Sequence, residues 1–130
     1  MQILQPADWA KPKGFSNGIA ASGRQVFVAG QIGWDAQCNF VGDDFVSQAA
    51  QALRNIVAVL AEAGARPEHI TRMNWYVLDK QEYLGAGRAL GLAYREIIGR
   101  HYPAMTAVQV VALIEDRARL EIEVTAVVPE

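Results

Sequence analysis

The sequence has little cysteine, no long apolar run and no excess of positive charge. Its 130 residues include one cysteine, so no disulfide forms within the chain and a cytoplasmic setting is expected. Lys and Arg number 12 against 14 Asp and Glu, which gives a formal net charge of -2 and makes nucleic acid an improbable partner. No signal peptide is expected at the start, and the longest apolar stretch, 103–114, is too short to cross a membrane.

Motifs for metals, nucleotides and activated nucleophiles are also absent. His69 and His101 lack the spacings of metal sites, so we predict neither a metal nor another cofactor. Cys38 lies among polar residues with no neighbouring base, which favours an incidental loop position. His101 follows the second predicted helix, where its charge would favour the helix dipole. The segment Gly30–Gly33 does not lead into a helix, so we interpret it as a turn and not as a phosphate loop.

No repeat or linker divides the chain, and residues 1–130 are predicted to form a single α+β domain. Apolar spacing predicts one helix between a cap at Asp43 or Asp44 and a stop at Gly64, and a second at about 81–100. The polar residues of the first helix are expected to meet water: Gln48, Gln51, Arg54, Asn55 and Glu62. The predicted strands are 25–31, with a possible hairpin to 18–22, then 70–78, 107–113 and 118–128.

Two helices cover only one face of such a sheet. The residues 26–29 and 107–113 are nevertheless apolar on both faces of their strands. The second face therefore needs a cover, and a symmetric oligomer is the simplest one. The alternative is that these strands are only well buried at the centre of the sheet.

Two carboxylates stand out on the last strand. Glu121 and Glu123 are two residues apart, so both side chains project from one face, roughly 7 Å from each other. Like charges removed from water raise a carboxyl pKa and create a general acid or base. The alternative is a solvated strand face whose charge is balanced by Arg117 or Arg119.

Read together, several segments resemble the RidA/YjgF family of reactive-intermediate deaminases, also called L-PSP endoribonucleases or translation inhibitors. The resemblance covers nearly the whole chain and is carried by the segments 14–18, 28–33, 51–56, 102–108 and 120–123. It implies a chorismate-mutase-like α+β fold with two helices on one face of a mixed sheet. It also implies a homotrimer with a central barrel and ligand clefts between subunits. Members of the family hydrolyse enamines and imines to a 2-keto acid and ammonia without a metal or cofactor.

The resemblance assigns roles to individual residues. Glu121 matches the family glutamate that positions and activates water, and Ala107 matches the main-chain position that contacts the substrate. The family arginine that clamps the substrate carboxylate is replaced by Met105, which removes an interaction worth roughly 1.5 to 3 kcal/mol. Phe15 replaces an aromatic residue that carries a hydroxyl group, and Ala29 replaces a small hydroxyl residue. The pattern indicates a divergent subgroup with a less polar pocket.

These substitutions leave two main functions open. In the first, Glu121 activates water against an imine or enamine that lacks the usual carboxylate or has it held by another donor. In the second, the trimer is a non-catalytic small-molecule-binding or regulatory protein, with a cleft lined by Phe15, Trp34 or Trp75 and Met105. Ordinary packing of these aromatic side chains and Met105 is the competing interpretation. RNA cleavage has less support because the chain is acidic.

Overall fold

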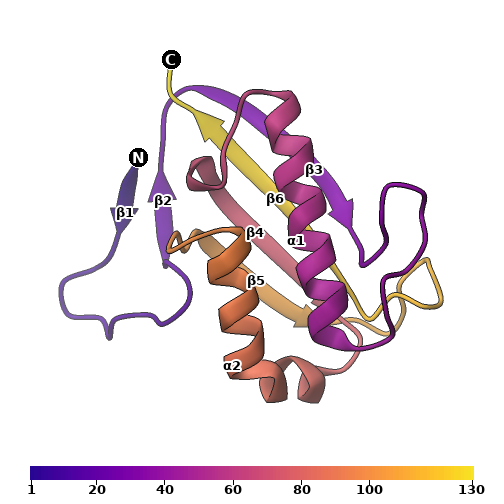
Figure 1. Ribbon diagram of the computed structural model, residues 1–130. Coiled ribbons are helices and arrows are strands. Elements are labelled where there is room, and N and C mark those ends of the chain that lie inside the picture. The colour runs from indigo at the N-terminus through magenta and orange to yellow at the C-terminus, as the bar shows by residue number, and fades with distance from the viewer.

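A computed structural model describes residues 1–130 and shows a four-stranded mixed sheet with two helices on one face (Figure 1). The strands lie in the order β3 (Arg24–Gln31), β6 (Leu120–Val128), β4 (Ile70–Val77) and β5 (Ala104–Gln109). The helices are α1 (Phe45–Glu62) and α2 (Lys80–Ile97), and a short 3-10 turn (Pro67–His69) precedes β4. Strand β6 is antiparallel to both neighbours, whereas β4 and β5 are parallel because α2 connects them. The predicted order of helices and strands is confirmed.

The N-terminal segment forms a separate two-stranded sheet, which the sequence did not predict. Strand β2 (Gly18–Ala20) pairs with β1 (Gln2–Leu4), so the predicted hairpin between 18–22 and the next strand is wrong. A buried serine just before β2 explains the difference. Ser16 is buried, its hydroxyl donates to the Tyr102 carbonyl at 2.5 Å, and its N–H donates to the Pro103 carbonyl at 3.0 Å. These bonds hold the N-terminal segment at the start of β5.

Helix α1 is the centre of the core. Asp44 caps it by accepting from the Ser47 N–H at 3.0 Å, and Gly64 ends it with a φ of 69°, as predicted. The prediction that its polar side chains meet water is wrong for two of them. Gln48 is fully buried, donates to the Gly42 and Arg117 carbonyls and accepts from the Arg119 N–H. Asn55 donates to the carbonyls of Ile32 and Trp34. Both side chains satisfy backbone groups of buried loops that no strand pairs.

Helix α2 is held much less tightly. It ends at Ile97, three residues before the predicted end, and Gly87 interrupts its helical geometry with φ 3° and ψ -84°. The apolar spacing of 81–100 predicts a buried stripe, and two of its members are buried, Tyr94 and, just after the helix, Ile98. The other members are only partly buried: Tyr83, Ala86, Leu90, Ala93 and Ile97. Helix α2 packs on α1 and leaves space above β4 and β5.

Two strand boundaries differ from the prediction. Strand β5 begins at Ala104 and ends at Gln109, because β4 ends at Val77 and offers no further partner after the bond from Val110 N–H to Val77 O. The remainder of the predicted strand is loop, in which Val111 is fully exposed. Strand β6 begins at Leu120 instead of Ala118.

The sheet face opposite the helices is uncovered. Along β6 the side chains of Leu120, Ile122, Val124 and Ala126 are buried toward the helices, and the alternate residues point to the open face. Phe27 of β3 lies on that open face with 70% of its surface exposed. Neither helix has the length and hydropathy of a membrane-spanning helix.

Candidate functional site

Three of the predicted site residues line one cavity beside β5. Phe15, Met105 and Ala107 surround a space of about 310 Å³ together with Lys13, Gly14 and Tyr83. We call this space the edge cavity. Met105 and Ala107 are aligned with Met73 and Trp75 of β4, which places both on the helix-covered side of the sheet. Phe15 arrives there because the neighbouring Ser16 is bonded to the start of β5.

Lys13 is the charged group of the edge cavity, and the sequence analysis missed it. Its ammonium group forms no ion pair in the structure. The only signal in the sequence was its position two residues before Phe15. A lysine at this place supplies a point charge to the cavity that Met105 also lines.

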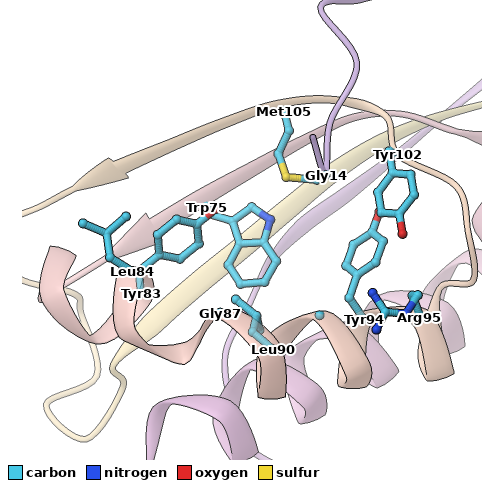
Figure 2. A pocket seen from close by; sticks show the side chains of 11 residues that line it. Gly14, Trp75, Tyr83, Leu84, Gly87, Leu90, Tyr94, Arg95, Tyr102 and Met105 are labelled. Carbon is cyan, nitrogen blue, oxygen red and sulfur yellow. The ribbon is translucent and has the colours of Figure 1, made fainter. Parts of the chain in front are cut away.

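A second and larger cavity lies behind Met105. Trp75 of β4, which is only 2% exposed, lines the cavity on the sheet side, and α2 lines the opposite side (Figure 2). We call this space of about 410 Å³ the α2 cavity. Trp34, the other tryptophan considered for the cleft, packs against Phe40 at 5.8 Å between ring centroids and lines neither cavity.

Glu121 lies on the open face, half-buried, against β3. A Cβ atom at Gly30 would lie 2.4 Å from Glu121 Oε2, so the carboxylate in its observed position lies directly over Gly30. No side chain donates a hydrogen bond to Glu121, and no cation pairs with it. The neighbouring Ala29 is exposed. Glu121 is therefore a carboxylate that packs over Gly30 and has free acceptor capacity.

Glu123 lies on the same face as Glu121 but, unlike Glu121, accepts hydrogen bonds from neighbouring side chains. Its Oε1 accepts from the Tyr76 hydroxyl at 2.5 Å and from Asn74 Nδ2 at 3.1 Å. The Glu123 hydrogen bond raises the pKa of Tyr76, with desolvation and the charges of Glu123 and Glu121 acting in the same direction. Two side-chain donors therefore already occupy Glu123 Oε1.

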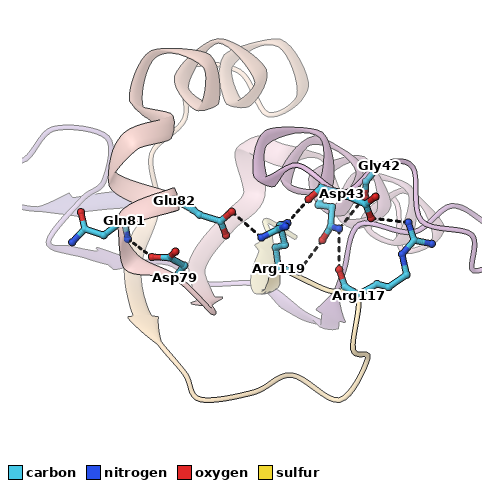
Figure 3. A network of polar contacts seen from close by, with 8 residues as sticks. Gly42, Asp43, Asp79, Gln81, Glu82, Arg117 and Arg119 are labelled. Atoms are coloured by element: carbon cyan, nitrogen blue, oxygen red, sulfur yellow. Dashed lines mark hydrogen bonds and ion pairs between the residues drawn. The ribbon is translucent and has the colours of Figure 1, made fainter.

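Arg117 and Arg119 form ion pairs with other carboxylates. The expectation that they balance the charges of Glu121 and Glu123 is therefore wrong. Arg119 pairs with Glu82 at 2.9 Å and Arg117 with Asp43 at 2.9 Å (Figure 3). Arg119 also donates to the Asp43 carbonyl. These contacts tie the loop before β6 to the starts of both helices, away from the open face.

One protomer does not bring all the predicted site residues together. Glu121 and Ala29 belong to the open face at the β3 side of the sheet, whereas Met105 and Ala107 face the helices from β5 at the other edge. Strand β4 lies between β6 and β5. A small molecule in the edge cavity therefore does not touch Glu121 of the same chain.

No group of three or more His, Cys, Asp or Glu side chains is placed to hold a metal ion. His101 lies beyond the end of α2, and its Nε2 donates to the Ile70 carbonyl at 2.6 Å. It therefore ties the loop before β5 to β4, which differs from the predicted dipole role. Cys38 is exposed on the loop between β3 and α1.

Comparisons with known proteins agree on one family. The family model described as Endoribonuclease L-PSP matches residues 8–128. A RutC family protein of Synechocystis is 34% identical over 99% of this chain and 98% of its own length. The 2-iminobutanoate/2-iminopropanoate deaminase of Salmonella typhimurium is 30% identical over 81% of this chain and 80% of its own length. The Rid family protein YyfB of Yersinia pestis, a protein of unknown function, has a TM-score of 0.85 and 30% identity, with 98% of each chain covered.

The contact between Tyr76 and Glu123 is testable by alkaline titration. We expect Glu123→Gln to lower the pKa of Tyr76, because the neutral amide no longer favours the protonated phenol. The measurement is ultraviolet absorbance of the phenolate, taken as the difference between wild type and variant. Tyr83 and Tyr94 also have raised pKa values because they are buried, and they cancel in this difference. Identical titration curves would contradict the contact.

Proposed function

This chain belongs to the Endoribonuclease L-PSP family, and from that membership we propose that it hydrolyses a small imine or enamine and releases ammonia. Two relatives are deaminases of this kind by name, one for 2-iminobutanoate and 2-iminopropanoate and one for reactive intermediates. In the proposed reaction water adds to the carbon of the C=N bond. The resulting carbinolamine loses ammonia and leaves a carbonyl group. The chain must supply a base for the water and a pocket that orients the carbon.

The free carboxylate of Glu121 is the observation that carries this proposal. Of the two carboxylates on the open face, Glu123 is already bonded to Tyr76 and Asn74. Glu121 has no side-chain donor and lies over Gly30. We therefore propose that Glu121 is the base that activates the attacking water, and that Glu123 has a structural role.

The lining of the edge cavity favours a substrate that carries a carboxylate, although the family arginine is missing. Met105 offers an uncharged thioether at that position, but Lys13 lines the same cavity without an ion-pair partner. We propose that the Lys13 ammonium pairs with the substrate carboxylate. Phe15 and Met105 then contact the apolar part of the substrate.

The separation of Glu121 from the edge cavity supports an assembly of several copies. We propose a homotrimer in which the open faces form a central barrel and Glu121 of one subunit meets the edge cavity of the next. The two surfaces that meet are different, which is the head-to-tail contact that closes into a ring. The exposed Phe27 on the open face and the family resemblance support the same arrangement.

A second candidate function is a binding or regulatory protein that uses the same cleft. Met105 in place of the arginine and the aromatic walls of the edge cavity favour it. Absence of turnover together with saturable stabilisation by a ligand would support this function. RNA cleavage has less support, because the net charge is -2 and the edge cavity holds a single cation.

The role of Glu121 is tested by removing its charge. We expect Glu121→Gln to lower the rate of imine hydrolysis by about a hundredfold or more, the usual contribution of a general base. An amino-acid oxidase generates 2-imino acids in the assay, and their loss is compared with the uncatalysed rate. Glu123→Gln is the matched control and should lose less than about tenfold. A Glu121→Gln variant as fast as wild type would refute the assignment.

Lys13 is tested through its effect on substrate binding. We expect Lys13→Gln to raise KM for a 2-imino acid by about tenfold with little change in kcat, because it removes a charged contact that does not change during the reaction. Lys11→Gln is the control, since Lys11 does not line the edge cavity. An equal effect of both substitutions would show that the edge cavity has no specific cation.

The proposed assembly is tested by placing a charge on the open face. Wild type should have a mass in solution of three times 14.2 kDa by light scattering. Phe27→Glu should reduce that mass, because the barrel would enclose an unpaired charge. Val59→Glu, at a site on α1 that is 41% exposed, should leave it unchanged. A monomeric wild type would contradict both the trimer and the shared site.

A further inference from the structure

The α2 cavity is large enough for a small organic molecule and lies within one protomer. Its volume of about 410 Å³ falls within the range of small-ligand pockets. Aromatic rings form most of its wall, with Trp75 and Tyr83 on one side and Tyr94 and Tyr102 on the other (Figure 2). The rings of Tyr94 and Tyr102 are stacked, 5.6 Å apart and inclined by 11°. Such a wall suits a flat apolar body.

Glycines on α2 keep this cavity open. Gly87 and Gly91 are one helical turn apart and both line it. A Cβ atom at Gly87 would meet no atom within 4 Å, and one at Gly91 would meet only Arg95 Nη1 at 3.5 Å. Side-chain packing within the protomer therefore does not require glycine at Gly91, although glycine weakens a helix, whereas Gly87 has the non-helical φ and ψ described above. Larger side chains there would fill the cavity.

Two donors beside the cavity have no partner: one is covered by neighbouring side chains, and the other belongs to an exposed residue. Trp75 is almost completely buried, and its Nε1 finds no hydrogen-bond acceptor in the protein. In Figure 2 this nitrogen is on the side of the ring that faces Met105 and Gly14. Arg95 is the charged residue of the lining, and its guanidinium forms no ion pair. A cation at one end and an unsatisfied N–H on the wall select a ligand with two acceptor groups.

We propose that the α2 cavity binds a small carboxylic acid with a flat apolar body and a carbonyl group. The carboxylate pairs with the Arg95 guanidinium, and the body lies between Trp75 and the stacked tyrosines. The carbonyl oxygen accepts from Trp75 Nε1 once the flexible Met105 side chain gives way. The α2 cavity shares Gly14, Tyr83 and Met105 with the edge cavity, but the proposed site uses neither Glu121 nor a second subunit, so its test does not require deaminase activity.

The probe for this site is 3-benzoylpropanoate, which carries a carboxylate, a ketone and a phenyl ring. We expect it to shift the indole N–H signal of Trp75 saturably in nitrogen–proton correlation spectra of the full-length protein, with the signal assigned by Trp75→Phe. Its neutral amide and 4-phenylbutanoate, which lacks the ketone, should each bind more weakly. Arg95→Gln should weaken binding of the acid by about tenfold and leave binding of the amide unchanged.

Two glycine substitutions locate the binding site. Gly91→Leu should abolish the shift by filling the cavity, and it should fold because leucine is a better helix former than glycine. Gly85→Leu is the matched control, since Gly85 is on the same helix, has open space around it and does not line the cavity. Both variants should keep the mass of wild type in solution.

Three results would overturn the proposal. The first is no saturable shift of the Trp75 signal up to millimolar probe. The second is binding that survives Gly91→Leu, which would place the probe elsewhere. The third is loss of assembly in Gly91→Leu alone, which would show that a second copy fills the cavity. None of these readouts involves turnover, so they are independent of the deaminase assay.

Discussion

Two helices cover one face of a four-stranded sheet, and the arrangement of charge and cavities depends on that one-sided cover. On the covered face, α1 builds the core and the loosely packed α2 leaves a cavity over Trp75. On the open face, β6 presents Glu121 and Glu123. The residues that resemble a deaminase site are therefore divided between two faces and two edges of one chain. In the proposed trimer, a second copy of the chain supplies the missing half of each site by symmetry.

The charged groups on β6 and beside the two cavities differ in whether they already have a partner. Arg117 and Arg119 are used to hold loops, and Glu123 is bonded to its neighbours on β4. Glu121, Lys13 and Arg95 are left without partners, and each lies at or beside a proposed ligand position. In the proposed function, the substrate carboxylate is recognised by Lys13, which belongs to the N-terminal segment.

The parts of the fold that local sequence determines were predictable, and the parts that depend on tertiary partners were not. The cap at Asp44, the stop at Gly64 and the alternation of β6 each follow from neighbouring residues. The burial of Gln48 depends on loop carbonyls supplied by distant segments. For the site, the resemblance named Glu121, Met105 and Ala107, and no local pattern marks Lys13, Arg95 or the unpaired Trp75 Nε1. Those three become visible only when the N-terminal segment and α2 are placed against β5 and β4.

In the proposed trimer two subunits form each catalytic site, and mixing subunits of two inactive variants tests this arrangement. Glu121→Gln removes the base, and Ala107→Trp fills the edge cavity, so each variant alone should be inactive. When the two are unfolded together, refolded and assayed for imine hydrolysis, about a quarter of the sites in a randomly mixed trimer should combine an intact base with an intact cavity. We expect the mixture to recover about a quarter of wild-type activity, while each variant refolded alone stays inactive. A mixture as inactive as its components would contradict a shared site.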